Sequence, residues 1–159
     1  MDIIQTIKQT IEEILKKMTI SVDKVDVVFD GEKKPKFLIQ SKDAPLLIGH
    51  KGEHFSALNH IIKKILHKNT KENEEEFKFS IDINGYQEEN LAMLKNKAKV
   101  VAERVRSFKT DIELDPMSSY ERMEIHTFLE NEPNIKTESR GEGKERRIVV
   151  KYVEDKLKV

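Results

Sequence analysis

The spacing of apolar residues divides the first half of the chain into helices and strands. A helical period of three or four predicts helices over residues 2–18 and 55–66, and strict alternation with polar residues predicts strands near 25–29, 37–39 and 77–83. The apolar positions behind these predictions are Ile3, Ile7, Ile11, Ile14 and Met18; Val25, Val27 and Phe29; Phe37 and Ile39; Phe55, Leu58, Ile62 and Ile65; and Phe77, Phe79, Ile81 and Ile83. Asp2 can cap the first helix, Asp30-Gly31 ends the first strand, and Asn69–Glu76 is predicted to be a charged connection.

Two glycines three residues apart, in Gly49-His50-Lys51-Gly52, lie between a short apolar turn opened by Pro45 and the second helix. Glycine lets a backbone turn tightly at a helix start, where amide groups point outward. We expect His50 and Lys51 to face solvent, so that the loop suits a sugar-phosphate backbone. A G-x-x-G pattern by itself is weak evidence, since turns between helices also use it for steric reasons.

The predicted order of the first half is helix, strand, strand, helix, glycine loop, helix, strand. It describes a three-stranded sheet with helices on one face. This order looks like the bacterial, type II, arrangement of the KH fold, whose GXXG loop clamps about four nucleotides of a single strand. The resemblance implies that Gly49, His50, Lys51 and Gly52 form such a clamp.

The second half begins with a long amphipathic helix over residues 87–107. Its apolar stripe is formed by Leu91, Leu94, Ala98, Val101, Val105 and Phe108. Strands are predicted at Thr110–Leu114, Ile135–Ser139 and Arg147–Val153, with Gly141-Glu142-Gly143 turning the last pair. Together with a helix over residues 117–130, these strands predict a second, small core.

Arg122 and His126 are four residues apart in the helix over residues 117–130, so both side chains project from one face. Ile125, Phe128 and Leu129 form the neighbouring apolar stripe, which places the pair at its edge. Either Asp115 or Ser118 can be the cap of this helix, and Pro116 fits its first turn. An arginine fork pairs well with phosphate oxygens, and histidine can donate to phosphate or stack on a base.

The stretch from Leu114 to His126, L-D-P-M-S-S-Y-E-R-M-E-I-H, and the later T-E-S-R-G-E-G-K-E-R-R-I-V-V resemble the R-three-H domain. With the glycine loop before it, nearly the whole chain resembles the bacterial Jag (SpoIIIJ-associated) family of cytoplasmic RNA-binding proteins. The resemblance implies a KH domain at 1–84 and a small α/β R-three-H domain at 85–159, joined by the long helix. It also implies a single-strand or terminal-phosphate site at Arg122 and His126, with Arg140, Arg146 and Arg147 nearby.

The same resemblance carries expectations about partners and role. It implies single-stranded RNA as ligand, with single-stranded DNA as an alternative, and a small single-KH protein or a second copy as protein partner. Family members are linked to cell elongation and envelope growth. Many also have an extra N-terminal domain, so this chain is expected to be a short form or a fragment.

Composition adds mainly exclusions. The chain has 159 residues with no cysteine or tryptophan, which excludes disulfides and zinc–thiolate sites, and we expect no cofactor or metal. The first 18 residues include six charged side chains, unlike a signal peptide or a membrane span. Net charge is zero, with 29 basic and 29 acidic residues, and residues 1–84 and 85–159 are each balanced. Phosphate contacts must therefore come from local clusters.

Two alternatives to a non-enzymatic RNA-binding protein remain. A nuclease or other hydrolase could use Glu121, Arg122, Glu124 and His126, although Glu124 points away from Arg122 and His126 on a helix. The long helix could instead serve dimerisation through its apolar stripe. If RNA binds, the bases could enter an apolar groove at Ile39, Ile48 and Phe55, for which core packing is the simpler explanation.

Overall fold

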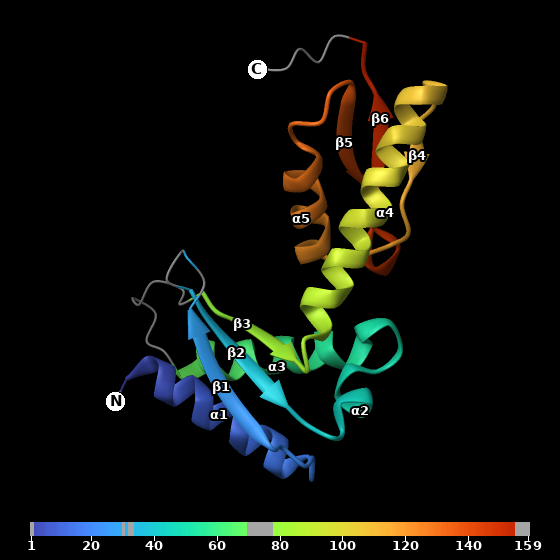
Figure 1. Cartoon of the computed structure of the whole chain (residues 1–159). Coiled ribbons are helices and arrows are strands. Elements are labelled where there is room, and N and C mark those ends of the chain that lie inside the picture. The colour runs from blue at the N-terminus through green and yellow to red at the C-terminus, as the bar shows by residue number, and fades with distance from the viewer. Residues whose placement is uncertain (1, 30, 32–33, 70–77, 155–159) are drawn as a thin grey trace. The chain divides into compact units, whose positions relative to one another are not determined.

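The structure is a computed structural model that describes residues 2–29, 31, 34–69 and 78–154. The chain has the predicted mixed α+β character and divides into two compact units, Met1–Glu88 and Glu89–Val159. Its elements are α1 (Ile3–Lys17), β1 (Lys24–Phe29), β2 (Pro35–Gln40), α2 (Ala44–Ile48), the 3-10 turn η1 (His50–Gly52), α3 (Glu53–Asn69), β3 (Ser80–Ile83), α4 (Tyr86–Phe108), β4 (Ile112–Glu113), α5 (Ser119–Leu129), β5 (Ile135–Arg140), the 3-10 turn η2 (Gly143–Glu145) and β6 (Arg147–Tyr152) (Figure 1). The predicted turn residue Asp30, the charged connection over 70–76 and Phe77 lie outside the described residues.

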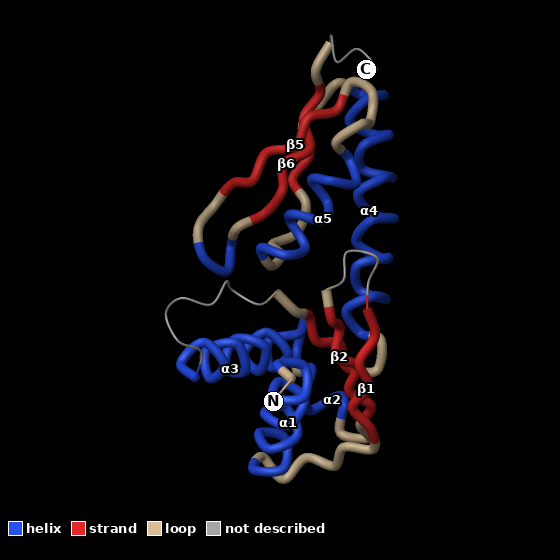
Figure 2. Tube along the Cα trace, turned by 90° about the vertical axis from the view of Figure 1, so that its left-hand side faces the viewer, coloured by secondary structure: helices blue, strands red, loops and turns tan. Residues whose placement is uncertain are grey.

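The first unit is a three-stranded sheet in the order β1-β2-β3, with α1 and α3 on one face (Figures 1 and 2). β1 runs antiparallel to β2, with Val27 opposite Phe37, and β2 runs parallel to β3, with Phe37 opposite Ile81. The buried core between sheet and helices consists of Ile7, Ile11, Leu15, Val25, Phe37, Ile39, Ala44, Leu47, Phe55, Leu58, Ile62, Ile81 and Ile83. The predicted order of elements and the three-stranded sheet are confirmed.

Helix α1 begins where the sequence predicts, because the Asp2 side chain accepts a hydrogen bond from the Ile4 amide at 3.3 Å. The buried stripe of this helix differs from the predicted one at its C-terminal end. Leu15 is fully buried, whereas Met18 is the C-cap residue and leaves 49% of its surface exposed. The prediction that Met18 continues the apolar stripe is therefore wrong, since the helix ends before it can turn inward.

Two further apolar residues of this unit were wrongly predicted to be buried. Phe29, at the last position of the edge strand β1, is 60% exposed. Ile65 in α3 is 37% exposed, and its neighbour Leu66 packs against the core instead. Phe29 lies at the end of its strand, whereas Ile65 lies beside the buried stripe of α3, which continues from Ile62 to Leu66.

A polar cluster around the buried Ser41 fixes the approach to the glycine loop. The Ser41 backbone pairs with the Asn84 amide side chain, its N–H donating to Oδ1 at 3.0 Å and its carbonyl accepting from Nδ2 at 2.9 Å. The Ser41 hydroxyl donates to the Ser21 carbonyl and accepts from the Asp43 amide. Because Asp43 directly precedes α2, these bonds anchor the start of that helix to the sheet.

The second unit is an antiparallel sheet in the order β4-β6-β5, with α4 and α5 on one face (Figures 1 and 2). Its buried core consists of Ala98, Val101, Ala102, Val105, Leu114, Ile125, Leu129, Ile135, Ile148 and Val150. The predicted burial of Phe108 and Phe128 is wrong, because they are 76% and 40% exposed. Phe108 is the last residue of α4, and Phe128 lies at the edge of the α5 stripe rather than within it.

Ser118 caps α5 and resolves the alternative left open by the sequence. Its hydroxyl accepts from the Glu121 amide, and the Glu121 carboxylate accepts from the Ser118 amide at 2.7 Å, which completes a capping box. Pro116 therefore precedes the helix instead of lying in its first turn.

Within the part of the chain that the structure describes, no helix is long and apolar enough to cross a membrane.

Candidate nucleic-acid interface

The glycine loop is a tight turn between α2 and α3 with three residues of positive φ. Gly49 has φ +70°, Lys51 +51° and Gly52 +77°. The His50 and Lys51 side chains are exposed, whereas Gly52 is buried. The expectation that all loop amides point outward needs correction. The Gly49 N–H donates to the Pro45 carbonyl at 3.0 Å, and the Gly52 N–H donates to the Gly49 carbonyl at 3.4 Å.

Both glycines are required by their surroundings as well as by their dihedral angles. A Cβ on Gly49 would lie 2.5 Å from Cγ of His54, and one on Gly52 would lie 2.8 Å from the hydroxyl oxygen of Tyr86. Tyr86 in turn packs edge-on against Phe55, with ring centroids 6.0 Å apart. Aromatic rings thus lie against both ends of the loop, while its two central side chains remain available to a ligand.

The residues suggested for a base-binding groove belong mainly to the core. Ile39 is fully buried and Phe55 is 9% exposed, and the half-buried Ile48 packs against the same cluster. These side chains are explained by packing. The glycine loop, by contrast, carries two exposed side chains, His50 and Lys51.

In the second unit, Arg122 and His126 lie half-buried on one face of α5, as their spacing predicts. Arg122 is held by its own helix start, where Nη1 donates to the Met117 carbonyl at 2.8 Å and Nη2 to the Ser119 hydroxyl at 3.1 Å. Nδ1 of His126 lies 2.7 Å from the Thr137 hydroxyl on β5. Neither partner of Arg122 is charged, and no carboxylate among the described residues pairs with the guanidinium.

The environment of His126 favours the neutral imidazole. Burial, and secondly the nearby Arg122 cation, lower the pKa of His126 from its ordinary value of 6.5. His126 also lines a shallow depression with Thr127, Glu130, Lys136 and Thr137. Glu130, the C-cap residue of α5, and Lys136 on β5 are the ionisable groups that line this depression with it.

We expect an NMR titration of His126 to give a midpoint below 6.5 in the free protein. Because the unfolded state then binds more protons between the folded pKa and 6.5, this residue lowers stability as the pH falls through that window. Replacing Arg122 by Gln should raise the midpoint only part of the way to 6.5, since burial is the larger cause. A midpoint at or above 6.5 in the parent protein would contradict this description of the site.

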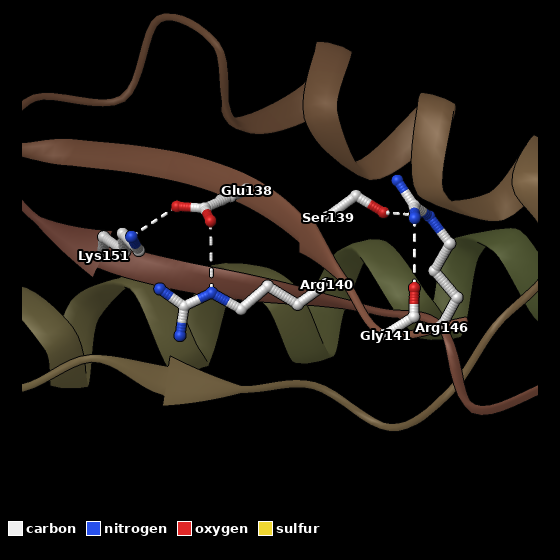
Figure 3. Close-up of polar contacts among 6 residues, drawn as sticks. All are labelled: Glu138, Ser139, Arg140, Gly141, Arg146 and Lys151. Atoms are coloured by element: carbon white, nitrogen blue, oxygen red, sulfur yellow. Dashed lines mark hydrogen bonds and ion pairs between the residues drawn. The ribbon is translucent and has the colours of Figure 1, made fainter.

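Arg146 is brought to the same side of the β5–β6 hairpin as His126. Its Nε donates to the Ser139 hydroxyl at 3.0 Å and its Nη1 to the Gly141 carbonyl at 3.0 Å (Figure 3). Ser139 and Thr137 are two residues apart on β5, so their side chains share one face of the strand. That face carries the hydroxyls that bind Arg146 and His126. We call Arg122, His126 and Arg146 the α5–β5 cation cluster, in which the two arginines supply the positive charge and the imidazole is a neutral hydrogen-bonding group.

Arg140 and Arg147 lie on the opposite face of the hairpin, where they are opposite each other in the strand register. Arg140 donates to Glu138 at 3.1 Å, and the same carboxylate contacts Lys151 (Figure 3). These cations lower the pKa of Glu138, the contact with Lys151 most strongly. Arg147 pairs with Glu145 at 3.0 Å and with Glu113 at 3.6 Å. Their charges are therefore compensated, unlike those of Arg122 and Arg146.

The two carboxylates considered for a hydrolase have structural partners. Glu121 completes the capping box and accepts from the Asn90 side chain at 2.6 Å, and Glu124 pairs with Lys95 at 3.0 Å. Among the residues that the structure describes, no group of three or more His, Asp or Glu side chains is arranged to hold a metal ion. Both glutamates are thus accounted for by the fold.

Comparison with known proteins decides the nature of the second unit. The family model of the R-three-H domain matches residues 92–152. The chain contains an R-three-H domain. The sequence predicts this domain, and the matched range includes the whole α5–β5 cation cluster.

The chain is also similar along most of its length to proteins named RNA-binding protein KhpB. It is 26% identical over 140 residues to the protein of Clostridium symbiosum (88% of this chain, 62% of the relative) and 32% identical over 132 residues to that of Bacillus subtilis (81% and 62%). It is 28% identical over 137 residues to the protein of Lactiplantibacillus plantarum (86% and 41%). The predicted relationship to the Jag family, to which KhpB proteins belong, is confirmed. The chain spans at most about three fifths of the length of these relatives.

Several residues that shape these sites were not predicted from the sequence. They are His54, Tyr86, Thr137 and Ser139. For Thr137 and Ser139 a signal was present, since both alternate with charged residues on a predicted strand. For His54 and Tyr86 none was present, because their roles depend on the path of the glycine loop.

Proposed function

We propose that this chain is a non-enzymatic protein that binds single-stranded RNA at two places. In this proposal, residues 1–84 act as a KH domain whose Gly49–Gly52 loop holds the sugar-phosphate backbone. The R-three-H domain, proposed for residues 85–159, contacts phosphate through Arg122 and His126. The names of the relatives support RNA as the ligand class, and single-stranded DNA is the alternative ligand to test in parallel.

One observation carries the proposal most directly. The glycine loop leaves His50 and Lys51 exposed on a turn whose glycines cannot bear a side chain. Such a turn lets a backbone ligand approach closely, and Lys51 supplies a positive charge for phosphate. Arg122 adds a second cation that no carboxylate among the described residues compensates.

Of the three arginines expected near the Arg122–His126 pair, we predict that only Arg146, the member of the cation cluster, contributes to RNA binding. Arg146→Gln should weaken binding of a single-stranded RNA about tenfold, because a charge-assisted hydrogen bond contributes about 1.5–3 kcal/mol. It should also reduce the slope of log affinity against log salt by about 0.7, the value for one phosphate contact. Fluorescence anisotropy at several salt concentrations measures both quantities.

Arg140→Gln is the matched control, since Arg140 lies on the same hairpin but is compensated by Glu138. It should change the affinity less than about twofold. Equal losses in the two variants, or a larger loss for Arg140→Gln, would show that the cluster has been assigned to the wrong face of the hairpin.

The remaining parts of the proposal rest on the family relationship. We propose that the protein acts in the cytoplasm as a post-transcriptional regulator linked to cell elongation or envelope growth, with a small single-KH protein or a second copy as partner. Crosslinking of the protein to RNA in its native cell, followed by sequencing, identifies the targets. Light scattering at increasing concentration tests for a dimer.

A further inference from the structure

His54 connects the two helices that flank the glycine loop. It lies in the first turn of α3, and its Nδ1 is 2.7 Å from the main-chain carbonyl oxygen of Leu46 in α2. Its ring also covers Gly49, where a Cβ would lie 2.5 Å from Cγ and 2.8 Å from Nδ1. One side chain therefore links α2 to α3 and lies against the first glycine of the loop.

The hydrogen bond fixes the form of the imidazole. A carbonyl oxygen can only accept, so Nδ1 carries the proton and donates to Leu46. α2 has only five residues, and the last carbonyls of a helix have no partner within it. His54 supplies the partner for the Leu46 carbonyl, and the side chain remains exposed on its other edge.

The loop needs such support because its backbone is unfavourable. Lys51 has a side chain at φ +51°, a conformation that is unfavourable for non-glycine residues and persists only where the surroundings impose it. Tyr86 lies against Gly52 at one end of the loop, and His54 lies against Gly49 at the other. A loop already held in its binding shape loses less conformational entropy when a ligand binds.

We propose that His54 is a positioning residue for nucleic-acid binding, which holds the Gly49–Gly52 loop in its binding conformation through the Nδ1–H bond to Leu46. This inference rests on the proposed function of the loop. It assigns no direct ligand contact to His54.

Substitution of His54 by asparagine or by glutamine distinguishes the roles of its two ring nitrogens. The amide nitrogen of Asn occupies the place of Nδ1 and can donate to Leu46, whereas that of Gln corresponds to Nε2. Binding of a single-stranded RNA 12-mer is measured well below the melting temperature of every variant. We expect His54→Asn to bind within about twofold of the parent and His54→Gln to bind about fivefold more weakly.

NMR distinguishes a role of His54 in positioning the loop from direct contact between His54 and the RNA. In the free protein, the ring nitrogen shifts of His54 should show a proton on Nδ1, and the Nε2 shift should change little when RNA is added. Equal affinities of the Asn and Gln variants would overturn the inference. A Gln variant that binds like the parent, or a large shift of Nε2 on RNA addition, would also overturn it, in favour of direct contact.

A further variant distinguishes failure of the proposed function of the loop from failure of the His54 assignment. The double variant His50→Asp/Lys51→Asp is measured in the same experiment. If it binds like the parent, the loop is not the docking site, and the basis of the His54 assignment is removed whatever its own variants do. If it loses binding while the Asn and Gln variants are equal, only the His54 assignment fails.

Discussion

Replacing His50 and Lys51 together by aspartate is expected to weaken binding of single-stranded RNA at least about tenfold and to leave the fold intact. The change alters the loop charge by about three units at pH 7, because lysine is lost and two carboxylates are gained. Each such charge, about 4 Å from a phosphate, contributes about 1 kcal/mol even in water. Tenfold corresponds to about 1.4 kcal/mol, so the expected loss is a conservative one.

The fold should tolerate this change because both side chains are exposed and aspartate is among the residues that accept a left-handed conformation such as that of Lys51. The matched control is His60→Glu/Lys64→Glu, which makes the same change of charge on the exposed side of α3. It should reduce the affinity less than about threefold. Equal losses for the two double variants would indicate general electrostatic attraction rather than a site at the loop.

Gly52→Ala is expected to destabilise the first unit by about 2–5 kcal/mol. About 1–2 kcal/mol comes from a side chain at φ +77°. Displacement of the Tyr86 ring, whose hydroxyl lies 2.8 Å from the new Cβ, adds about 1–3 kcal/mol of the kind found for overpacked sites. Urea unfolding followed by circular dichroism measures the loss. Hydrogen exchange of the β2 amides assigns it to the first unit.

Gly85→Ala separates the two causes. Gly85 has nearly the same backbone angle, φ +75°, but a Cβ there would meet no atom within 4 Å. This variant should lose only about 1–2 kcal/mol. If the two alanine variants are equally destabilised, the close contact between Gly52 and Tyr86 has no energetic consequence and the description of the loop must change.

The sequence could predict the fold because its signals are local. Alternation in β2 and β3 and the helical period of α1 each follow from a few neighbouring residues, and their order defines the sheet. The errors lie at the edges of elements. Met18 and Phe108 continue a helical period but lie where their helices end, and Ile65 lies beside the buried stripe that Leu66 continues. Periodicity does not report where a core ends.

The site was only partly predictable for a different reason. The spacing of Arg122 and His126 fixes their common face, so the pair was found. Which later arginine joins them depends on strand register, since Arg146 precedes β6 by one residue and Arg147 begins it. That difference of one position sends one side chain toward Ser139 and the other toward Glu145. The bond between His54 and Leu46 depends on the loop's path, which no local pattern encodes.

The most direct test of the account is an NMR titration of the isotope-labelled protein with a mixed-sequence single-stranded RNA. The account predicts that the largest changes occur at the amides of Gly49–Gly52 and at the guanidinium signals of Arg122 and Arg146, with little change at Arg140. Saturable binding that leaves the signals of Gly49–Gly52 unchanged would contradict the claim that this loop is the docking site for an unpaired strand.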